Sequence, residues 1–179
     1  HPKFVTRLIN DLFGIQTRAG CSCAGPYGHH LMQIQTRDSD YYRCLISNAG
    51  YSGIKPGWVR LNLHYSMTEA EVDYFIAAVR FVLEHGYKFL SQYEFNIKNG
   101  EWTHLDHQMP KPVELDLELG YGDGSDEPAA IPDAEGKFPQ YLEEAERVAE
   151  RLPEDFALLS FKPELERLLF FYVHKMTGI

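Results

Sequence analysis

The chain concentrates its unusual residues in Gln16-Thr-Arg-Ala-Gly-Cys-Ser-Cys-Ala-Gly-Pro-Tyr-Gly-His-His30, a stretch that holds two of its three cysteines. Because proline is favoured at the first position of a helix, we predict that a strand or loop here turns into a helix at about Pro26. Cys23 then lies just before a helix N-terminus, where unpaired N–H groups and the positive end of the helix dipole favour a thiolate. The stretch therefore predicts a reactive cysteine, with the positive charge of Arg18 nearby. A buried or redox-inert cysteine is the alternative.

The segments on either side of this stretch are predicted to be helical. Apolar residues recur at helical spacing over residues 1–15, which predicts a helix that ends at Gly14. A second helix is predicted over residues 26–34. Residues 35–56 are polar and then aromatic, so we expect a short helix in a segment that resembles an insertion more than a core element.

A strand is predicted over residues 58–65, because apolar and polar residues alternate there. The alternation places Arg60 on the polar face, and the opposite, buried face consists of Val59, Leu61, Leu63 and Tyr65. A planar guanidinium matches a carboxylate with two parallel hydrogen bonds, so Arg60 is a candidate clamp for a substrate carboxylate. An ordinary surface arginine is the alternative.

The clearest helix begins at Thr68, which forms a capping box with Glu71. We expect Gly86 to end this helix in a left-handed conformation. Asn-Gly between two extended runs predicts a hairpin over residues 94–102. The apolar stripe of the helix is predicted to be Val72, Phe75, Ile76, Val79, Val82 and Leu83.

The chain changes in character after Pro110. Residues 113–136 contain eight acidic residues and no lysine or arginine. Residues 113–119 are predicted to be an edge strand and residues 120–136 a linker. Two more helices are predicted over residues 139–151 and 163–176.

These elements together predict an α+β fold. A small antiparallel sheet with helices packed mainly on one side is expected in a first domain, residues 1–110. An acidic segment and linker, residues 111–137, and a C-terminal helical extension, residues 138–179, complete the expected organisation.

Three pieces of the chain carry a family resemblance, and they occur in the family's order: Phe13-Gly-Ile-Gln-Thr-Arg-Ala-Gly-Cys-Ser-Cys-Ala-Gly-Pro-Tyr-Gly-His29, Gly57-Trp-Val-Arg-Leu-Asn-Leu-His-Tyr65 and Thr68-Glu-Ala-Glu-Val-Asp73. Together they resemble the C-terminal small domain of the class V aminotransferases, enzymes of fold type I that use pyridoxal 5′-phosphate (PLP). That family includes the cysteine desulfurases. The resemblance covers the first of the three predicted regions.

The resemblance implies roles for individual residues. Arg60 would bind the α-carboxylate of an amino-acid substrate, Arg18 would help to position it, and Cys23 would attack the substrate sulfur and become a persulfide. The lysine that holds PLP is expected in a large domain outside this chain. The expected partners are that large domain, the substrate and a second copy of the parent, because the family forms homodimers.

A different class of function stays open at this point. The chain would instead be a non-enzymatic interaction module in which Cys21 and Cys23 bind metal or sense redox state. His29 and His30 would complete a zinc site, but Cys-x-Cys is not the usual zinc knuckle and adjacent histidines on a helix point about 100° apart. We therefore expect no metal site.

Composition narrows the partners and the compartment. The chain has 179 residues and a formal net charge of -9, which argues against nucleic acid or an anionic membrane as a partner. It has no apolar run of the roughly 20 residues that span a bilayer and no secretory signal. Three cysteines are an odd number for a disulfide framework, so we expect a reducing, cytoplasmic setting. The chain begins at His1 rather than at methionine, so we expect a fragment. Because the resemblance places the PLP lysine in a domain outside this chain, we expect the fragment to be inactive alone.

Overall fold

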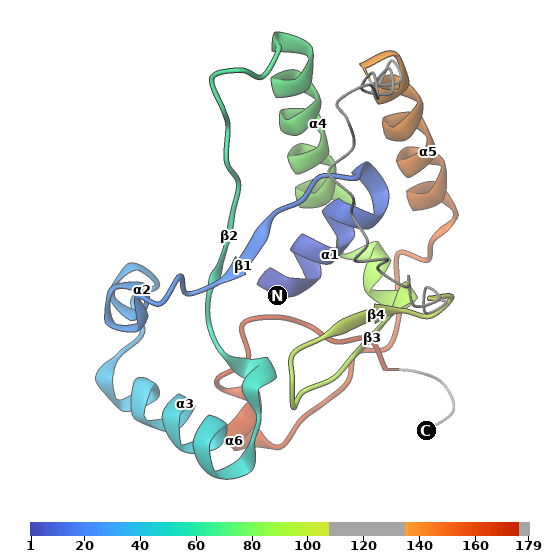
Figure 1. The fold of residues 1–179 in the computed structure, drawn as a ribbon. Coiled ribbons are helices and arrows are strands. Elements are labelled where there is room, and N and C mark those ends of the chain that lie inside the picture. Colours follow the sequence, from blue (N-terminus) through green and yellow to red (C-terminus); the bar gives the residue numbers. More distant parts are fainter. Residues whose placement is uncertain (108–134, 176–179) are drawn as a thin grey trace, which may run out of the picture.

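The computed structural model describes residues 1–107 and 135–175. These residues form an α+β fold in which the strands pair two by two, as two separate antiparallel sheets (Figure 1). The prediction of an α+β fold is confirmed, and the prediction of a single small sheet is wrong. The edge strand predicted at residues 113–119 and nearly all of the predicted linker lie outside the described residues.

The helices are α1 (Pro2–Phe13), α2 (Gly25–Leu31), α3 (Thr36–Ala49), α4 (Glu69–His85), α5 (Phe138–Arg151) and α6 (Pro163–Glu166). The strands are β1 (Arg18–Gly20), β2 (Trp58–Arg60), β3 (Tyr93–Phe95) and β4 (Trp102–His104). Short 3-10 helices are η1 (Ser52–Ile54), η2 (Lys88–Gln92) and η3 (Glu135–Lys137).

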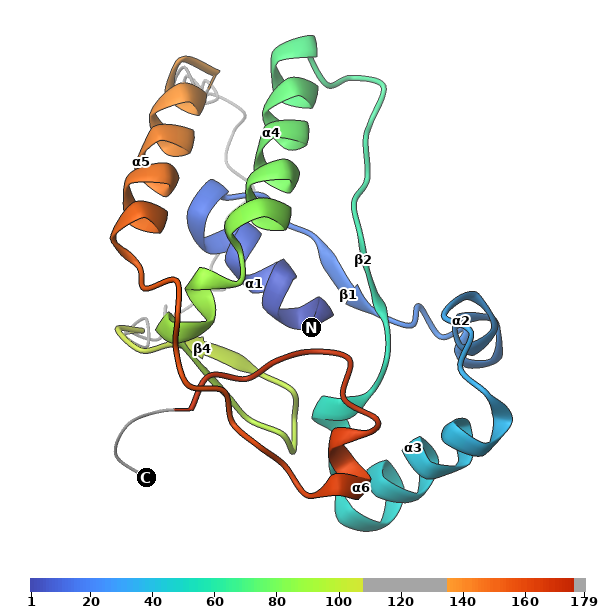
Figure 2. The same ribbon diagram turned by 180° about the vertical axis from the view of Figure 1, so that it is seen from behind.

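The main core forms around α1, as its apolar spacing predicts. Leu8 and Ile9 are almost fully buried, and Gly14 ends the helix with φ 66°. Helices α4 and α5 lie side by side and both pack on α1, which Figure 2 shows from behind. Tyr74 of α4 and Phe138 of α5 stack with ring centroids 4.1 Å apart. The helix predicted over residues 139–151 is therefore present as α5, and it packs on α1 and α4 in the main core.

A second, smaller core lies where α3, η1 and α6 meet. Its buried residues are Tyr42, Ile54 and Leu168. The predicted short helix in residues 35–56 is in fact the 14-residue α3. This segment therefore has a hydrophobic cluster of its own.

The predicted strand over residues 58–65 is shorter than expected. Strand β2 ends at Arg60, because β1 is its partner and the pairing ends where Arg18 lies opposite Arg60. Beyond Arg60 the backbone has no neighbouring strand with which to form hydrogen bonds, so the alternating residues do not extend the strand. Three residues of the predicted buried face are consequently exposed: Leu61 (36%), Leu63 (63%) and Tyr65 (95%).

Helix α4 has the predicted start but a different buried face. The capping box of Thr68 with Glu71 is present. The buried residues are Tyr74, Ala78, Phe81 and Val82, whereas Ile76 and Leu83 of the predicted stripe are exposed. Gly86 is right-handed, with φ −56°, so the predicted left-handed cap is wrong. A Cβ at Gly86 would clash with the carbonyl oxygen of Val82. A glycine fits here because there is no room for a side chain, and not because the backbone is left-handed.

The C-terminal part is less helical than predicted. Of the helix expected over residues 163–176, only α6 forms. After α6 the chain is extended near His174, which forms an antiparallel β-bridge with Leu158. The predicted hairpin is present as β3 and β4, with Gly100 at φ 73° in its turn. None of the helices in residues 1–107 and 135–175 combines the length and apolar character that a membrane crossing requires.

Candidate functional site

The ribbon formed by β1 and β2 brings together the two arginines that the sequence singles out. Arg18 lies directly opposite Arg60, Ala19 opposite Val59, and Gly20 opposite Trp58. Residues directly opposite each other in an antiparallel pair project their side chains from the same face. The two guanidinium groups therefore share one face of the ribbon.

Neither arginine has an acidic partner among the described residues. Both are exposed, and the ion pairs in residues 1–107 and 135–175 involve other side chains. Like charges directly opposite each other destabilise a sheet pair. An anion between Arg18 and Arg60 would relieve that repulsion and accept charge-assisted hydrogen bonds from both.

A strained turn follows the ribbon and carries Cys23. Ser22 and Cys23 both have positive φ, 52° and 59°, and the Ala24 N–H donates to the Cys21 carbonyl at 2.9 Å. Positive φ at both central residues defines a type I′ turn, which normally uses Asn or Gly there. Strained backbone of this kind clusters at functional sites. The turn leaves the Cys23 thiol free and exposed, and Cys21 and Cys44 are also free.

Close glycine contacts fix the position of the turn between β1 and α2. A Cβ on Gly57 would lie 2.9 Å from the Gly20 Cα. The two glycines therefore let the backbone before β2 approach the backbone at the end of β1 closely. A Cβ on Gly28 of α2 would lie 2.8 Å from the Trp58 ring. Trp58 lies two residues before Arg60 and so on the same face of β2. Helix α2 therefore packs on the face of the ribbon that carries both arginines.

The three predicted site residues lie along one short stretch of structure. The turn begins at Cys21, three residues beyond Arg18, or about 10 Å along the chain. No hydrogen bond or ion pair joins Cys23 to either arginine in the described structure. The two arginines lie opposite each other, and Cys23 lies in the turn that follows β1.

The described residues do not offer a complete site for PLP or a metal. No described lysine is buried, and Lys175, which the sequence places after a histidine, is exposed. Across the described ranges, no three His, Cys, Asp or Glu side chains are arranged to hold a metal ion, so Cys21, Cys23, His29 and His30 are not gathered as ligands.

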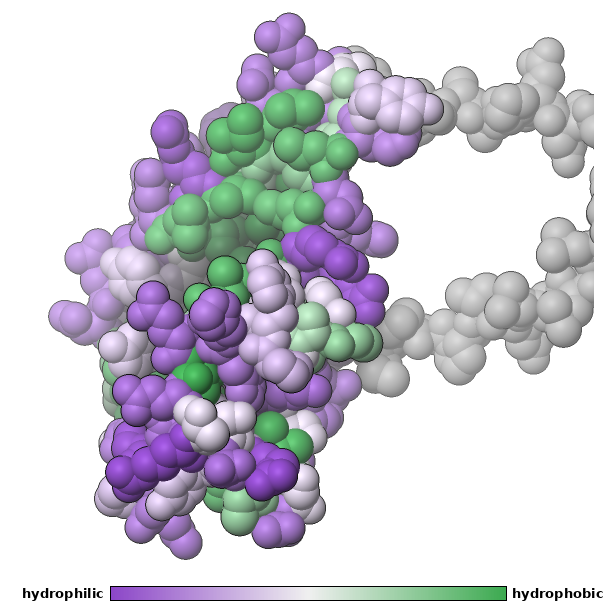
Figure 3. All heavy atoms as spheres, turned by 90° about the vertical axis from the view of Figure 1, so that its left-hand side faces the viewer, coloured by the Kyte–Doolittle hydropathy of each residue, from purple (hydrophilic) through white to green (hydrophobic). Residues whose placement is uncertain are grey.

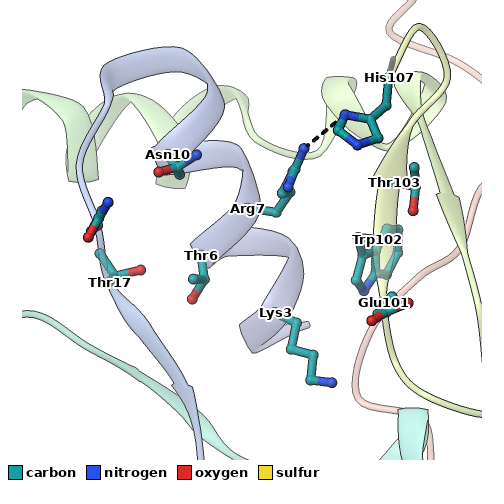
Figure 4. A pocket seen from close by; sticks show the side chains of 10 residues that line it. Lys3, Thr6, Arg7, Asn10, Thr17, Glu101, Trp102, Thr103 and His107 are labelled. Atoms are coloured by element: carbon teal, nitrogen blue, oxygen red, sulfur yellow. Dashed lines mark hydrogen bonds between the residues drawn. The ribbon is translucent and has the colours of Figure 1, made fainter. Parts of the chain in front are cut away.

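A polar groove follows the outer face of α1, on another part of the molecule (Figure 4). It has a volume of about 610 Å³ and runs from Thr17, before β1, across α1 to β4. Figure 4 shows Arg7 directed at His107, with a nitrogen–nitrogen distance of 3.5 Å. Thr6 and Thr17 each bury a hydroxyl that has no hydrogen-bond partner among the described residues.

Sequence patterns did not indicate this groove or a second pocket, which we call the α2–α3 pocket. The α2–α3 pocket is lined by residues of both helices and by Lys55 and Pro56. Its residues come from segments whose proximity depends on tertiary packing. The one available signal was the pair His29 and His30, which the sequence assigns to a possible metal site.

No known protein family, no curated protein and no solved structure matches this chain.

Proposed function

We propose that this chain is the part of a PLP-dependent enzyme, of the class V aminotransferase type, that holds the carboxylate of an amino-acid substrate. The observation that carries the proposal is the register of β1 and β2, which sets Arg18 opposite Arg60, with no acidic partner for either among residues 1–107 and 135–175. Two guanidinium groups on one face supply the paired donors that a carboxylate accepts. In such an enzyme PLP, bound by the large domain, supplies the electron sink for the reaction.

Cys23 supports a more specific activity, cysteine desulfuration. Its thiol is exposed on the strained turn that follows β1, the strand that carries Arg18. In this reaction the Cys23 thiolate attacks the sulfur of bound cysteine and forms the sulfur–sulfur bond of a persulfide. The carbon–sulfur bond of the substrate breaks, its electron pair stays with the carbon, and protonation there gives alanine.

An exposed apolar face supports the presence of a further domain. We use this name for Ile76 and Leu83 on α4 with Leu61 and Leu63 before it, all of which are exposed. Figure 3 shows hydrophobic side chains gathered on this side of the molecule. Contiguous exposed apolar surface marks interaction sites, so the large domain of the parent is its proposed partner.

The carboxylate assignment is tested in the intact enzyme by steady-state kinetics of Arg60→Gln and Arg18→Gln. We expect kcat/KM for the amino acid to fall about 100-fold for Arg60→Gln, since a charged hydrogen-bonded pair is lost. Arg60→Lys should rescue poorly, because an ammonium lacks the planar fork. Arg80→Gln removes an exposed arginine of α4 and serves as the matched control. Unchanged affinity and turnover in Arg60→Gln would contradict the assignment.

The desulfurase activity is tested by sulfide release from L-cysteine. Cys23→Ser should lose it while PLP absorbance is retained, and Cys21→Ser should keep it. Equal sulfide release by Cys23→Ser and wild type would leave an aminotransferase-like enzyme.

The alternative, a metal or redox module, is tested by metal analysis of protein purified without added metal. Zinc bound through the two thiols would favour that module over the enzyme.

A further inference from the structure

The α2–α3 pocket has the size and the chemistry of a small-molecule site. Its volume is about 640 Å³, and small-molecule sites range from about 300 to 1,000 Å³. Apolar side chains of Ile34 and Ile46 form part of the wall. The polar residues that line it include His29, His30, Thr36, Ser39, Arg43 and Lys55.

The charge of the pocket is opposite to that of the molecule. None of the described residues that line it is acidic, although the chain carries a formal net charge of -9. Arg43 forms one ion pair, with Asp40 outside the pocket, at 3.0 Å and with side chains 78% and 63% exposed. Such exposed pairs are weak. Lys55 has no ion-pair partner in the described part of the chain. Both cations are therefore available to a ligand.

Packing holds the walls of the pocket in place. His29 Nδ1 lies 2.9 Å from the Ser39 hydroxyl, which links α2 to α3. Tyr42 is 7% exposed and donates its hydroxyl to the Leu168 carbonyl, which ties α3 to the second core. A pocket whose sides are already fixed loses less conformational entropy when a ligand binds.

We propose that the α2–α3 pocket binds a small molecule that carries a phosphate group. The phosphate would contact Arg43 and Lys55, and the body of the molecule would lie against Ile34 and Ile46. Two cations and several hydroxyl donors around one anion match the charge of up to -2 and the three free oxygens of a phosphate ester better than the single charge and two oxygens of a carboxylate. The site uses neither Arg18, Arg60 nor Cys23, so it stands apart from the proposed function.

The test is a nuclear magnetic resonance titration of the whole chain with phenyl phosphate, inorganic phosphate and benzoate at millimolar concentrations. We expect phenyl phosphate to bind most tightly and to shift the amide signals of His29, Ser39 and Arg43. Inorganic phosphate should bind more weakly at the same residues, because it lacks the apolar body. Benzoate binding as tightly as phenyl phosphate would overturn the phosphate assignment, and the absence of shifts in the pocket would overturn the site.

Variants separate the pocket from general charge effects. Arg43→Gln and Lys55→Gln should each weaken phenyl phosphate binding about tenfold, since each removes a charged donor. Arg37→Gln removes an arginine of the same helix that lies outside the pocket, against the Tyr41 ring at 6.0 Å. It should leave the affinity unchanged. Equal weakening in all three folded variants, judged by their spectra, would show attraction to general positive charge and would contradict the proposal.

Discussion

Two threonines of the polar groove bury hydroxyl groups without an internal partner. The Oγ1 atoms of Thr6 and Thr17 have no hydrogen bond within the described residues, and both residues line the groove in Figure 4. A buried hydroxyl without a partner is destabilising by about 1–3 kcal/mol. The groove therefore either carries this destabilisation or holds water or a ligand on these two hydroxyls.

Replacing one of these hydroxyls by a methyl group decides between the two cases. Thr17→Val keeps the shape, so we expect the free energy of unfolding to rise by about 1 kcal/mol if the hydroxyl is unpaired. Thr103→Val is the control, because Thr103 lines the same groove but is exposed. Denaturant unfolding measures both. A loss of stability in Thr17→Val would show that water or a ligand satisfies the hydroxyl.

Buried tyrosines predict how stability depends on pH. Tyr74 donates its hydroxyl to the Phe13 carbonyl at 3.0 Å. Burial, and then the neighbouring Tyr141, raise the pKa of Tyr74 from 10.0 to about 12. Burial also raises the pKa of Tyr42 and of Tyr93. The unfolded chain thus loses these protons at a lower pH than the folded one.

The sign of the effect follows from that difference. The contribution of Tyr74 to stability is complete below pH 10 and is lost as the pH rises from 10 towards 12. Unfolding measured across this range should show a smaller decline for Tyr74→Phe than for wild type. Parallel declines in the two proteins would show that Tyr74 does not titrate differently on folding.

Among the elements, those predicted correctly have local causes. The capping box of Thr68 and the Asn-Gly turn before β4 depend on residues within a few positions, and both form as expected. Strand β2 stops at Arg60 because β1 has no further residue paired with it. The alternation of apolar and polar residues over 58–65 does not show how long the partner strand is. The helix over residues 163–176 fails for the same kind of reason, since the chain there pairs Leu158 with His174 instead.

Helix α2 tests whether one glycine contact sets the position of an element. Gly28→Ala would place a Cβ 2.8 Å from the Trp58 ring, so α2 or the ring must move. We expect a loss of about 1–3 kcal/mol in the free energy of unfolding, as in other overpacked sites. Gly25→Ala in the same helix meets nothing within 4 Å and should be neutral or slightly stabilising. Equal stability of the two variants, by thermal unfolding, would show that the contact is easily relieved.

In the molecule as a whole, the sequence predicts site residues but not their arrangement. Residue type and the family resemblance indicate Arg18, Cys23 and Arg60, whose roles are proposals. Their arrangement depends on the register that sets Arg18 opposite Arg60 and on two positive φ angles at Ser22 and Cys23. Neither feature has a short-range signature, because Ser-Cys is not a typical type I′ pair.

Helix α4 leads to a prediction about the whole molecule, because it has apolar residues on two faces. One face packs in the main core, and the other belongs to the exposed apolar face, with Ile76 57% and Leu83 81% exposed. These two residues are seven positions apart and so lie on one side of the helix. An apolar face that another domain normally covers should make the isolated chain self-associate.

The double variant Ile76→Lys with Leu83→Lys should therefore reduce self-association in sedimentation velocity at rising protein concentration. Its free energy of unfolding should change by less than about 0.5 kcal/mol per site, because exposed positions tolerate substitution. Leu105→Lys is the control, since Leu105 is 49% exposed and follows β4, outside the exposed apolar face. If the wild type stays monomeric at the highest concentration, the exposed apolar face needs no partner, and the proposed large domain loses its structural support. If only the double variant becomes monomeric, the exposed apolar face is what holds copies of the chain together. That face is the one that the proposed large domain would cover.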